Sequence, residues 1–196
     1  MLAPQTPVSL LERLRLKPDE ASVWERLFQL YRPLLERWME RFAFQPADRD
    51  DLVQDILLVL LRELPNFKHS GQAGAFRKWL RLITVHRCQD RLRAGKVRAA
   101  GGGDELAKAL EELAAPDSEL GRRWDEEHNR HVARRMLELI AVEFEPATQQ
   151  AFRRLVLEDG DVRTVAAELG LSVNAVYIAK SRVLQRLRQE IRGLVD

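Results

Sequence analysis

The chain has 196 residues, of which 45% are hydrophobic and 32% are charged, and its formal net charge is only +2. This length holds one domain of ordinary size or two small ones, and the nearly neutral balance alone does not point to a nucleic-acid partner. A single cysteine, Cys88, excludes an intramolecular disulfide, and the longest apolar run, 56–61, is far shorter than the roughly 20 residues that cross a bilayer. Because residues 1–9 lack a charged start followed by an apolar run, we expect a cytoplasmic protein with no membrane partner.

Apolar residues at helical spacing dominate the first half of the chain. Residues 23–42 follow this spacing, with Pro33 marking either a kink or the first turn of a second helix. Asp48 is a suitable cap for the next helix, which ends before a polar, glycine-bearing loop at 66–74. A long helix is then predicted from about 75 to 98.

The second half of the chain begins with a break in the helical pattern. Three consecutive glycines, 101–103, stand near the start of an acidic, alanine-rich stretch that we interpret as a linker, 99–122, with a short helix at about 104–113. Further helices are predicted at about 123–144, 146–157, 162–169 and 172–194. The expected fold is therefore all-α, with two small helical domains, 1–98 and 123–196, joined by a flexible linker.

Residues 162–181 have the pattern of a helix-turn-helix. Ala166 is small where two helices would cross closely, Gly170 supplies the backbone conformation that ends the first helix, and Ser172 can cap the second. Apolar residues recur at spacings that bury one face, at Val165, Leu169, Leu171 and Val176. The residues expected to face outward are Asn174, Ala175, Tyr177, Ile178, Ser181 and Arg182. Because all four features agree, we prefer this motif to an ordinary helical hairpin, and its second helix enters the major groove of duplex DNA.

Charge is distributed in blocks along the chain. Residues 76–98 carry eight basic side chains against one acid, residues 99–121 carry six acids against one lysine, and residues 172–192 carry five basic side chains against one acid. This alternation indicates two surfaces that meet an anion, separated by a segment that does not meet one or that imitates one.

Several short motifs together carry a family resemblance. In the first half they are Leu30-Tyr31-Arg32-Pro33, Asp50-Asp51-Leu52-Val53-Gln54-Asp55, Phe76-Arg77-Lys78-Trp79-Leu80 and Asp90-Arg91-Leu92-Arg93. In the second half, within residues 145–192, they are Ser181-Arg182 and Leu184-Gln185-Arg186-Leu187-Arg188. With these motifs the chain resembles, over nearly all of its length, a bacterial RNA polymerase sigma factor of the extracytoplasmic-function type. The family ordinarily carries a glutamate where Asp55 stands here.

The resemblance implies a division of labour among the parts of the chain. The helix that bears Asp51 to Asp55 would dock on the clamp of the largest subunit of core RNA polymerase, and the following loop and basic helix would recognise and open the minus 10 element of promoter DNA. The C-terminal domain would read the minus 35 element as duplex and contact the flap of the second-largest subunit. The acidic linker would run through the polymerase toward its active site and RNA exit path. Short sigma factors of this type are usually held inactive by an anti-sigma factor, but no residue here identifies one.

Particular residues are expected in these roles. Contacts to the minus 35 element are expected from Ser172, Asn174, Ala175, Tyr177, Ile178, Lys180, Ser181, Arg182 and Arg186. Within this set, Asn174 can pair with adenine, Arg182 can contact guanine or phosphate, and Lys180 can contact phosphate. Contacts to the minus 10 element are expected from Lys68, His69, Ser70, Arg77, Arg81, Arg87 and Arg91, with Phe76 and Trp79 in the core. Binding to core polymerase is assigned to Asp51, Leu52, Gln54 and Asp55, whose alternative role is the polar face of a helix.

No catalytic constellation accompanies these motifs. His128 and His131, and His86 near Cys88, lack the companions that a zinc site needs, and no glycine-flanked nucleophile, phosphate loop or metalloprotease helix occurs. We therefore expect no enzymatic activity and no cofactor or metal. Two alternatives to a promoter-specificity subunit stay open: a free-standing helix-turn-helix DNA-binding regulator that reads an operator as a dimer, and a module that sequesters polymerase without initiating.

Overall fold

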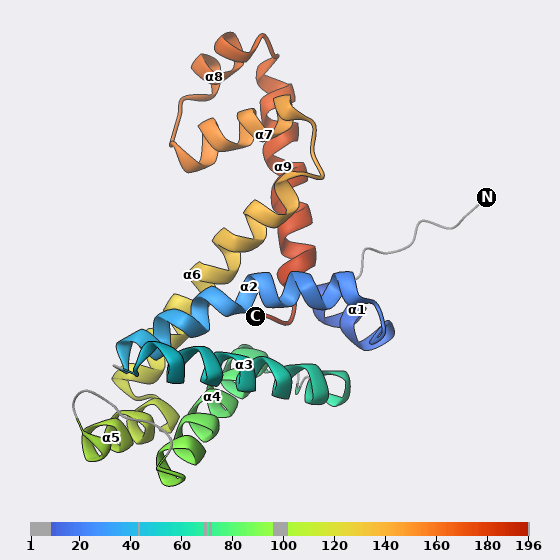
Figure 1. The fold of residues 1–196 in the computed structure, drawn as a ribbon. Coiled ribbons are helices and arrows are strands. Elements are labelled where there is room, and N and C mark those ends of the chain that lie inside the picture. Colours follow the sequence, from blue (N-terminus) through green and yellow to red (C-terminus); the bar gives the residue numbers. More distant parts are fainter. Residues whose placement is uncertain (1–8, 43, 69, 71, 96–101, 196) are drawn as a thin grey trace. The chain divides into compact units, whose positions relative to one another are not determined.

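The structure is a computed structural model that describes residues 9–42, 44–68, 70, 72–95 and 102–195. Within these ranges the regular elements are helices (Figure 1), which confirms the predicted all-α fold. The described residues form two compact units: the N-terminal unit comprises residues 9–132 and 192–195, and the C-terminal unit comprises residues 133–191. None of the helices in the described ranges combines the length and apolar character needed to cross a membrane.

The N-terminal unit is a bundle of helices around one core. Its helices are α1 (Leu10–Leu16), α2 (Ala21–Arg41), α3 (Pro46–Glu63), α4 (Ala75–Arg93), α5 (Gly103–Ala114) and the part of α6 (Glu119–Ala141) that precedes residue 133. In this unit α2 and α3 lie side by side, α4 packs against α3, and α5 packs against α4 (Figure 1). α2 continues through Pro33, so no second helix begins there. Tyr31 and Trp38 on its inner face are 0% exposed, because aromatic side chains gain most from leaving water.

Two helix boundaries in this unit differ from the expectation. α3 begins at Pro46 with Gln45 at its N-cap, so Asp48 does not cap the helix and instead places its charge in the first turn, where the helix dipole favours it. α4 ends at Arg93, and residues 96–98 of the longer helix that we expected lie outside the described residues.

α1 is a helix that apolar spacing alone does not reveal. The Ser9 hydroxyl accepts a hydrogen bond from the Glu12 N–H at 3.3 Å, and the Glu12 carboxylate accepts one from the Ser9 N–H at 2.9 Å. This reciprocal capping box has a sequence signature, a serine followed three residues later by a glutamate, that predicts a helix start. Leu10 and Leu14 are 0% exposed, so α1 belongs to the core of the unit.

The segment expected to be a flexible linker contains a packed helix. The predicted short helix is present as α5, and its leucines Leu106, Leu110 and Leu113 are buried where it meets α4. Their spacing of four and three residues puts them on one face, which explains the packing. α6 begins at residue 119, rather than at the expected 123, and the boundary between the two units falls inside it, after Val132.

The C-terminal unit contains the remainder of α6 and three further helices. These are α7 (Pro146–Phe152), which continues as a π-helical turn (Arg153–Leu157), α8 (Val162–Leu169) and α9 (Val173–Ile191). α7 and α8 both pack against α9 (Figure 1). The small core between them is made by Ala151, Val165, Ala166, Val176 and Ala179.

Candidate nucleic-acid interface

The turn between α8 and α9 is fixed by backbone hydrogen bonds. Gly170 adopts a left-handed conformation with φ of 64°, and its N–H donates to the carbonyl of Ala167 at 3.3 Å. The N–H of Leu171 donates to the carbonyl of Ala166 at 2.9 Å, which completes the pair of bonds of a Schellman motif. The Ser172 hydroxyl then accepts from the N–H three residues later, at 3.1 Å. The left-handed glycine and the serine cap that the sequence predicted are therefore both present, and they fix the turn by which the chain enters α9.

The amino-terminal half of α9 has a buried face and an exposed face. Val176 and Ala179 are buried in the small core. Of the residues predicted to face outward, Asn174, Tyr177, Ile178, Ser181 and Arg182 are exposed and Ala175 is partly exposed; of the other predicted minus 35 contacts, Ser172 is exposed and Lys180 is partly exposed. Tyr177 is 51% exposed and Ile178 is 43% exposed. Large apolar side chains that are exposed next to each other are typical of a surface that contacts a partner. In duplex DNA, the thymine methyl group is an apolar contact that such side chains can make. A shallow depression on this face is lined by Tyr177, Lys180, Ser181, Leu184, Gln185 and Arg188.

Arg186 differs from the other residues predicted to contact the minus 35 element. Its Nε lies 2.7 Å from Oε2 of Glu143, and its Nη2 contacts both Glu143 and the fully buried Glu190. Its guanidinium is therefore already paired with two carboxylates of its own unit. In this structure Arg186 stabilises the C-terminal unit.

Two arginines of α4, Arg77 and Arg81, are also held inside their own unit. Arg81 is 5% exposed, and its Nη1 lies 3.7 Å from Oδ1 of Asp125 on α6. Arg77 Nε lies 3.4 Å from Oδ2 of the same carboxylate, and Arg77 Nη1 donates to the Val195 carbonyl at 2.8 Å. Both arginines were expected to be phosphate contacts, and here both are paired with a carboxylate of their own unit.

Further along α4, Arg91 is paired with two carboxylates, whereas Arg87 is more accessible. Arg91 Nε donates to Oδ2 of Asp55 at 3.0 Å, and its Nη1 lies 3.5 Å from Oδ2 of Asp51. Arg87 Nη2 lies 2.9 Å from Asp90 on the same helix, with 41% of the arginine side chain exposed. Exposed pairs of this kind are weak and exchange easily with solvent or another anion, so Arg87 remains available to a phosphate.

The residues assigned to polymerase binding divide between the surface and the core. Asp51 and Gln54 are exposed on α3, and Asp55 is partly exposed. Leu52 is 0% exposed, so its assignment to the polymerase-binding surface is incorrect for this structure. The reason is its helical phase, since Leu52 lies on the buried face of α3 with Val53 and Ile56.

Aromatic rings lie beneath the loop that precedes α4. The centroid of the Phe67 ring lies 4.7 Å from the ring centroid of Trp79 and 5.8 Å from that of Phe76. Phe76 is fully buried, as expected, whereas Trp79 is partly exposed and does not lie wholly in the core. Of the three loop residues predicted to contact the minus 10 element, Lys68 and Ser70 are exposed, and His69 lies outside the described residues.

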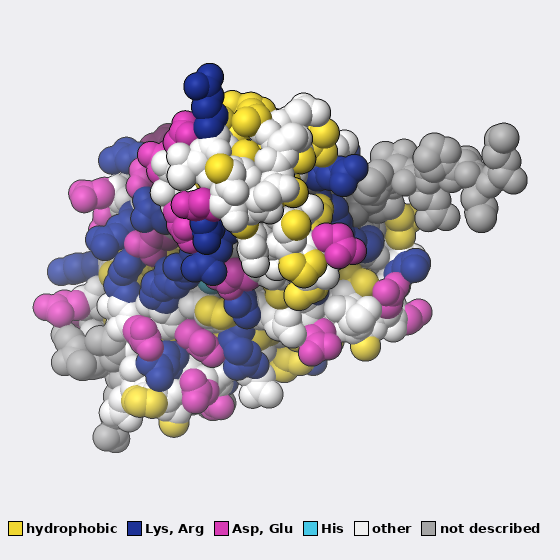
Figure 2. Space-filling view, turned by 90° about the horizontal axis from the view of Figure 1, so that it is seen from above, with side chains coloured by type: hydrophobic (Ala, Val, Ile, Leu, Met, Phe, Trp, Pro, Cys, Tyr) yellow, Lys and Arg dark blue, Asp and Glu magenta, His cyan; other side chains and the backbone are white. Residues whose placement is uncertain are grey.

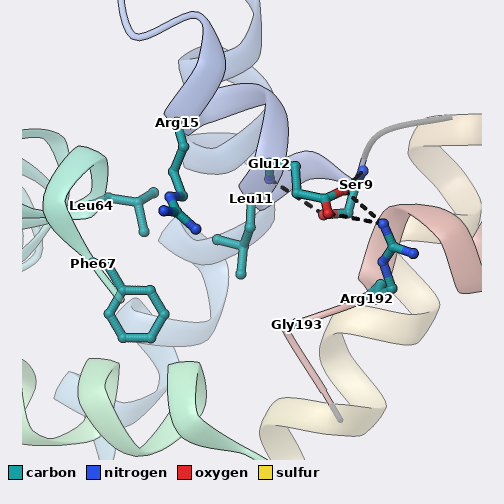
Figure 3. Close-up of a pocket in the computed structure, with 8 residues that line it drawn as sticks. All are labelled: Ser9, Leu11, Glu12, Arg15, Leu64, Phe67, Arg192 and Gly193. Carbon is teal, nitrogen blue, oxygen red and sulfur yellow. Dashed lines mark hydrogen bonds and ion pairs between the residues drawn. The ribbon is translucent and has the colours of Figure 1, made fainter. Parts of the chain in front are cut away.

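A cavity of about 210 Å³ opens beside Phe67 in the N-terminal unit (Figure 3). It is lined by Ser9, Leu11, Glu12, Arg15, Leu64, Phe67, Arg192 and Gly193. Glu12 lies between Ser9 and Arg192, and the Arg192 guanidinium donates to its carboxylate at 2.8 and 2.9 Å. Arg15 and the ring of Phe67 point toward the same space (Figure 3). The cavity is smaller than the roughly 300 to 1,000 Å³ of a typical small-molecule site.

Basic and acidic side chains lie next to one another on the protein surface. On the face shown in Figure 2, Lys and Arg side chains are interleaved with Asp and Glu side chains. The ion pairs of Arg77, Arg91 and Arg186 described above follow the same pattern.

The two histidines on α6 serve packing. His128 Nε2 lies 3.3 Å from the Tyr31 hydroxyl, and His131 Nε2 donates to the Leu30 carbonyl at 2.7 Å, which places both rings against α2. Among the described residues, no group of three or more His, Cys, Asp or Glu side chains is arranged to hold a metal ion.

One stretch in the first half of the chain matches a known family model. Residues 27–98 match the family model of sigma-70 region 2, a span that includes most of α2 and all of α3 and α4. The match lies within the N-terminal unit. A search among curated proteins finds no match to the chain.

Proposed function

We propose that the protein is a sigma factor of the extracytoplasmic-function type, which binds core RNA polymerase and directs it to selected promoters. The match of residues 27–98 to sigma-70 region 2 carries this proposal. The helix-turn-helix that follows in the same chain supports the finer assignment, because region 2 and a duplex-reading domain separated by a short segment are the two parts that this type requires.

In this proposal the N-terminal unit engages polymerase and the minus 10 element. The exposed acids of α3, centred on Asp51, face the clamp of the largest subunit, and the loop at Lys68 and Ser70 meets the opened strand. A polar loop beside the Phe67 and Trp79 rings suits this role, since stacking on an aromatic ring offsets the few kcal/mol that removing a base from the duplex costs.

The C-terminal unit reads the minus 35 element as duplex in the same proposal. The exposed side of α9 carries Asn174, whose amide can donate to and accept from adenine, and Lys180 and Arg182 supply positive charge for phosphate or guanine. The flap of the second-largest polymerase subunit is the further partner of this unit, and an anti-sigma factor is a candidate regulator.

Reconstituted run-off transcription tests the proposal. Core RNA polymerase, a promoter library and the full chain are combined, and we expect transcripts from a defined subset of promoters only when the chain is present. Binding of the isolated chain to a duplex operator without polymerase would instead indicate a free-standing regulator. Tight binding to core polymerase without any transcript would indicate a sequestering module. Either of these two results would overturn the proposal.

A further inference from the structure

The first half of α6 is bound to the N-terminal unit through one face. Trp124 is 0% exposed, and its ring packs against that of Trp38 on α2 with 4.9 Å between the ring centroids. One turn later, His128 contacts the Tyr31 hydroxyl, and His131 donates to a carbonyl of α2 at 2.7 Å. These contacts recur every three or four residues, so a continuous stripe of α6 is docked on α2.

The same part of α6 also holds the arginines of α4. The Asp125 carboxylate lies 3.4 Å from Arg77 and 3.7 Å from Arg81. One turn earlier, Gly121 lets Arg81 lie directly against the α6 backbone, because a Cβ atom there would come within 2.6 Å of Arg81 Nη1. A glycine and an aspartate four residues apart therefore form a receptor for Arg81 on one face of the helix.

This receptor takes the arginines out of reach of a DNA strand. The Arg81 side chain is only 6% exposed and that of Arg77 only 18% exposed. Carboxylate and phosphate are both anionic partners of a guanidinium, so Asp125 competes with a phosphate for the same two arginines. Arg87, on the same helix but away from α6, keeps 41% of its side chain exposed.

We propose that the first half of α6 is an internal competitor of promoter DNA, and that Arg77 and Arg81 bind the DNA backbone only after Asp125 and this segment have left the N-terminal unit. The inference rests on the proposed function and adds a regulatory step to it. In the free chain Asp125 is paired with Arg77 and Arg81. Binding of DNA by the N-terminal unit then exchanges a carboxylate for a phosphate on the same two arginines.

Binding of the full chain to DNA tests the exchange. The probe is a short fluorescein-labelled single-stranded DNA of mixed sequence, followed by anisotropy over a range of salt concentrations. Asp125→Asn keeps the side-chain shape and removes the charge, and we expect about three- to tenfold tighter binding than for the wild type. The plot of log affinity against log salt should steepen by about 0.7 for each additional phosphate that the freed arginines neutralise.

Glu126→Gln is the matched control, because it removes the same charge from an exposed position of the same helix turn. It should bind as the wild type does. Equal affinity and equal salt dependence for Asp125→Asn and Glu126→Gln would overturn the inference, since any tighter binding would then owe nothing to the two arginines.

Hydrogen exchange of the wild type provides a second measurement that does not depend on the folding of a variant. The amides of residues 119–132 should lose protection when the single-stranded DNA is bound, and unchanged protection would also overturn the inference. Run-off transcription separates this result from the proposed function. If the wild type directs transcription while both tests are negative, only the internal competition fails, and if the wild type directs none, the proposed function fails as well.

Discussion

Arg91 on α4 and Asp55 on α3 form an ion pair in which the guanidinium Nε lies 3.0 Å from the carboxylate Oδ2. The hydrogen bond with Asp55, and then the charges of Asp55 and Asp51, raise the pKa of Arg91 against the opposing effect of burial, so the arginine is always charged. Arg91 thereby links the basic helix α4 to the acidic residues of α3. A partner that binds the acids of α3 must compete with Arg91, and releasing Arg91 adds a cation to the face proposed for DNA.

Reversing the charge at Asp51 should weaken binding to core polymerase. Its side chain is 64% exposed and only 3.5 Å from Arg91 at its closest, so folding depends little on it. We expect Asp51→Lys to reduce affinity for core polymerase by about tenfold, because like charges then face each other across the interface. The control is Asp50→Lys, whose side chain is 73% exposed on the neighbouring position. Equal affinity of the two variants in a fluorescence binding assay would contradict the assignment of α3.

Asn174 and Lys180 should respond differently to truncation if α9 reads duplex DNA. Asn174→Ala should cost about 1 to 3 kcal/mol and relax the preference at one base pair, because it removes a base contact. Lys180→Ala should weaken all sequences alike and reduce the salt slope by about 1, because it removes a phosphate contact. Selection of minus 35 sequences from a library by each variant, with the wild type alongside, measures both effects. If Asn174→Ala keeps the base preference of the wild type, Asn174 does not contact a base.

Gly170 should be costly to replace for a reason confined to the backbone. Nothing lies within 4 Å of where its Cβ would be, but φ is +64°, so Gly170→Ala adds only strain. We expect a loss of about 1 to 2 kcal/mol in the free energy of unfolding of the C-terminal unit. Gly170→Asn should lose less, since asparagine tolerates this conformation. All four tryptophans lie in the N-terminal unit, so far-UV circular dichroism should report the change while tryptophan fluorescence does not.

The two helices α8 and α9 and the turn between them were predictable because their determinants are local. α8 spans Val162–Leu169 as expected from the apolar spacing, and the turn at Gly170 and the cap at Ser172 each act within a few residues of their own position. The same is true of α1, whose capping box of Ser9 and Glu12 is readable from two residues.

The ionic partners of the basic residues were not predictable, because they depend on contacts between distant parts of the chain. Arg186 pairs with Glu143, 43 positions away, and Arg77 donates to a carbonyl 118 positions away. Neither charge counts nor helical periodicity contains that information. The packing of α5 could have been predicted from the sequence. Its three leucines form an apolar face, and such a face indicates a packed helix rather than a flexible linker.

His128 is neutral in the folded protein because it is buried between α6 and α2. Burial lowers the pKa of His128 from its ordinary value of 6.5 to about 3, a hydrogen bond with Asn129 opposes this change, and the charges of Arg77 and His131 add to it. A neutral ring with its proton on Nδ1 can donate to the Asn129 side chain and accept from the Tyr31 hydroxyl, each at 3.3 Å.

The free energy of unfolding of the N-terminal unit should therefore fall as the pH falls from about 6.5 toward 3. The slope attributable to His128 is up to about 1.4 kcal/mol per pH unit, because in this window the unfolded chain binds a proton that the folded protein does not. Above this window the ring is neutral in both states and contributes no dependence. Urea unfolding at a series of pH values, followed by tryptophan fluorescence, measures the free energy of unfolding. His128→Gln keeps an acceptor for the tyrosine and should flatten the profile, whereas His86→Gln, at an exposed position of α4, should keep the slope of the wild type. If the free energy of unfolding depends equally on pH in the two variants between about pH 3 and 6.5, His128 is not the group whose protonation causes that dependence.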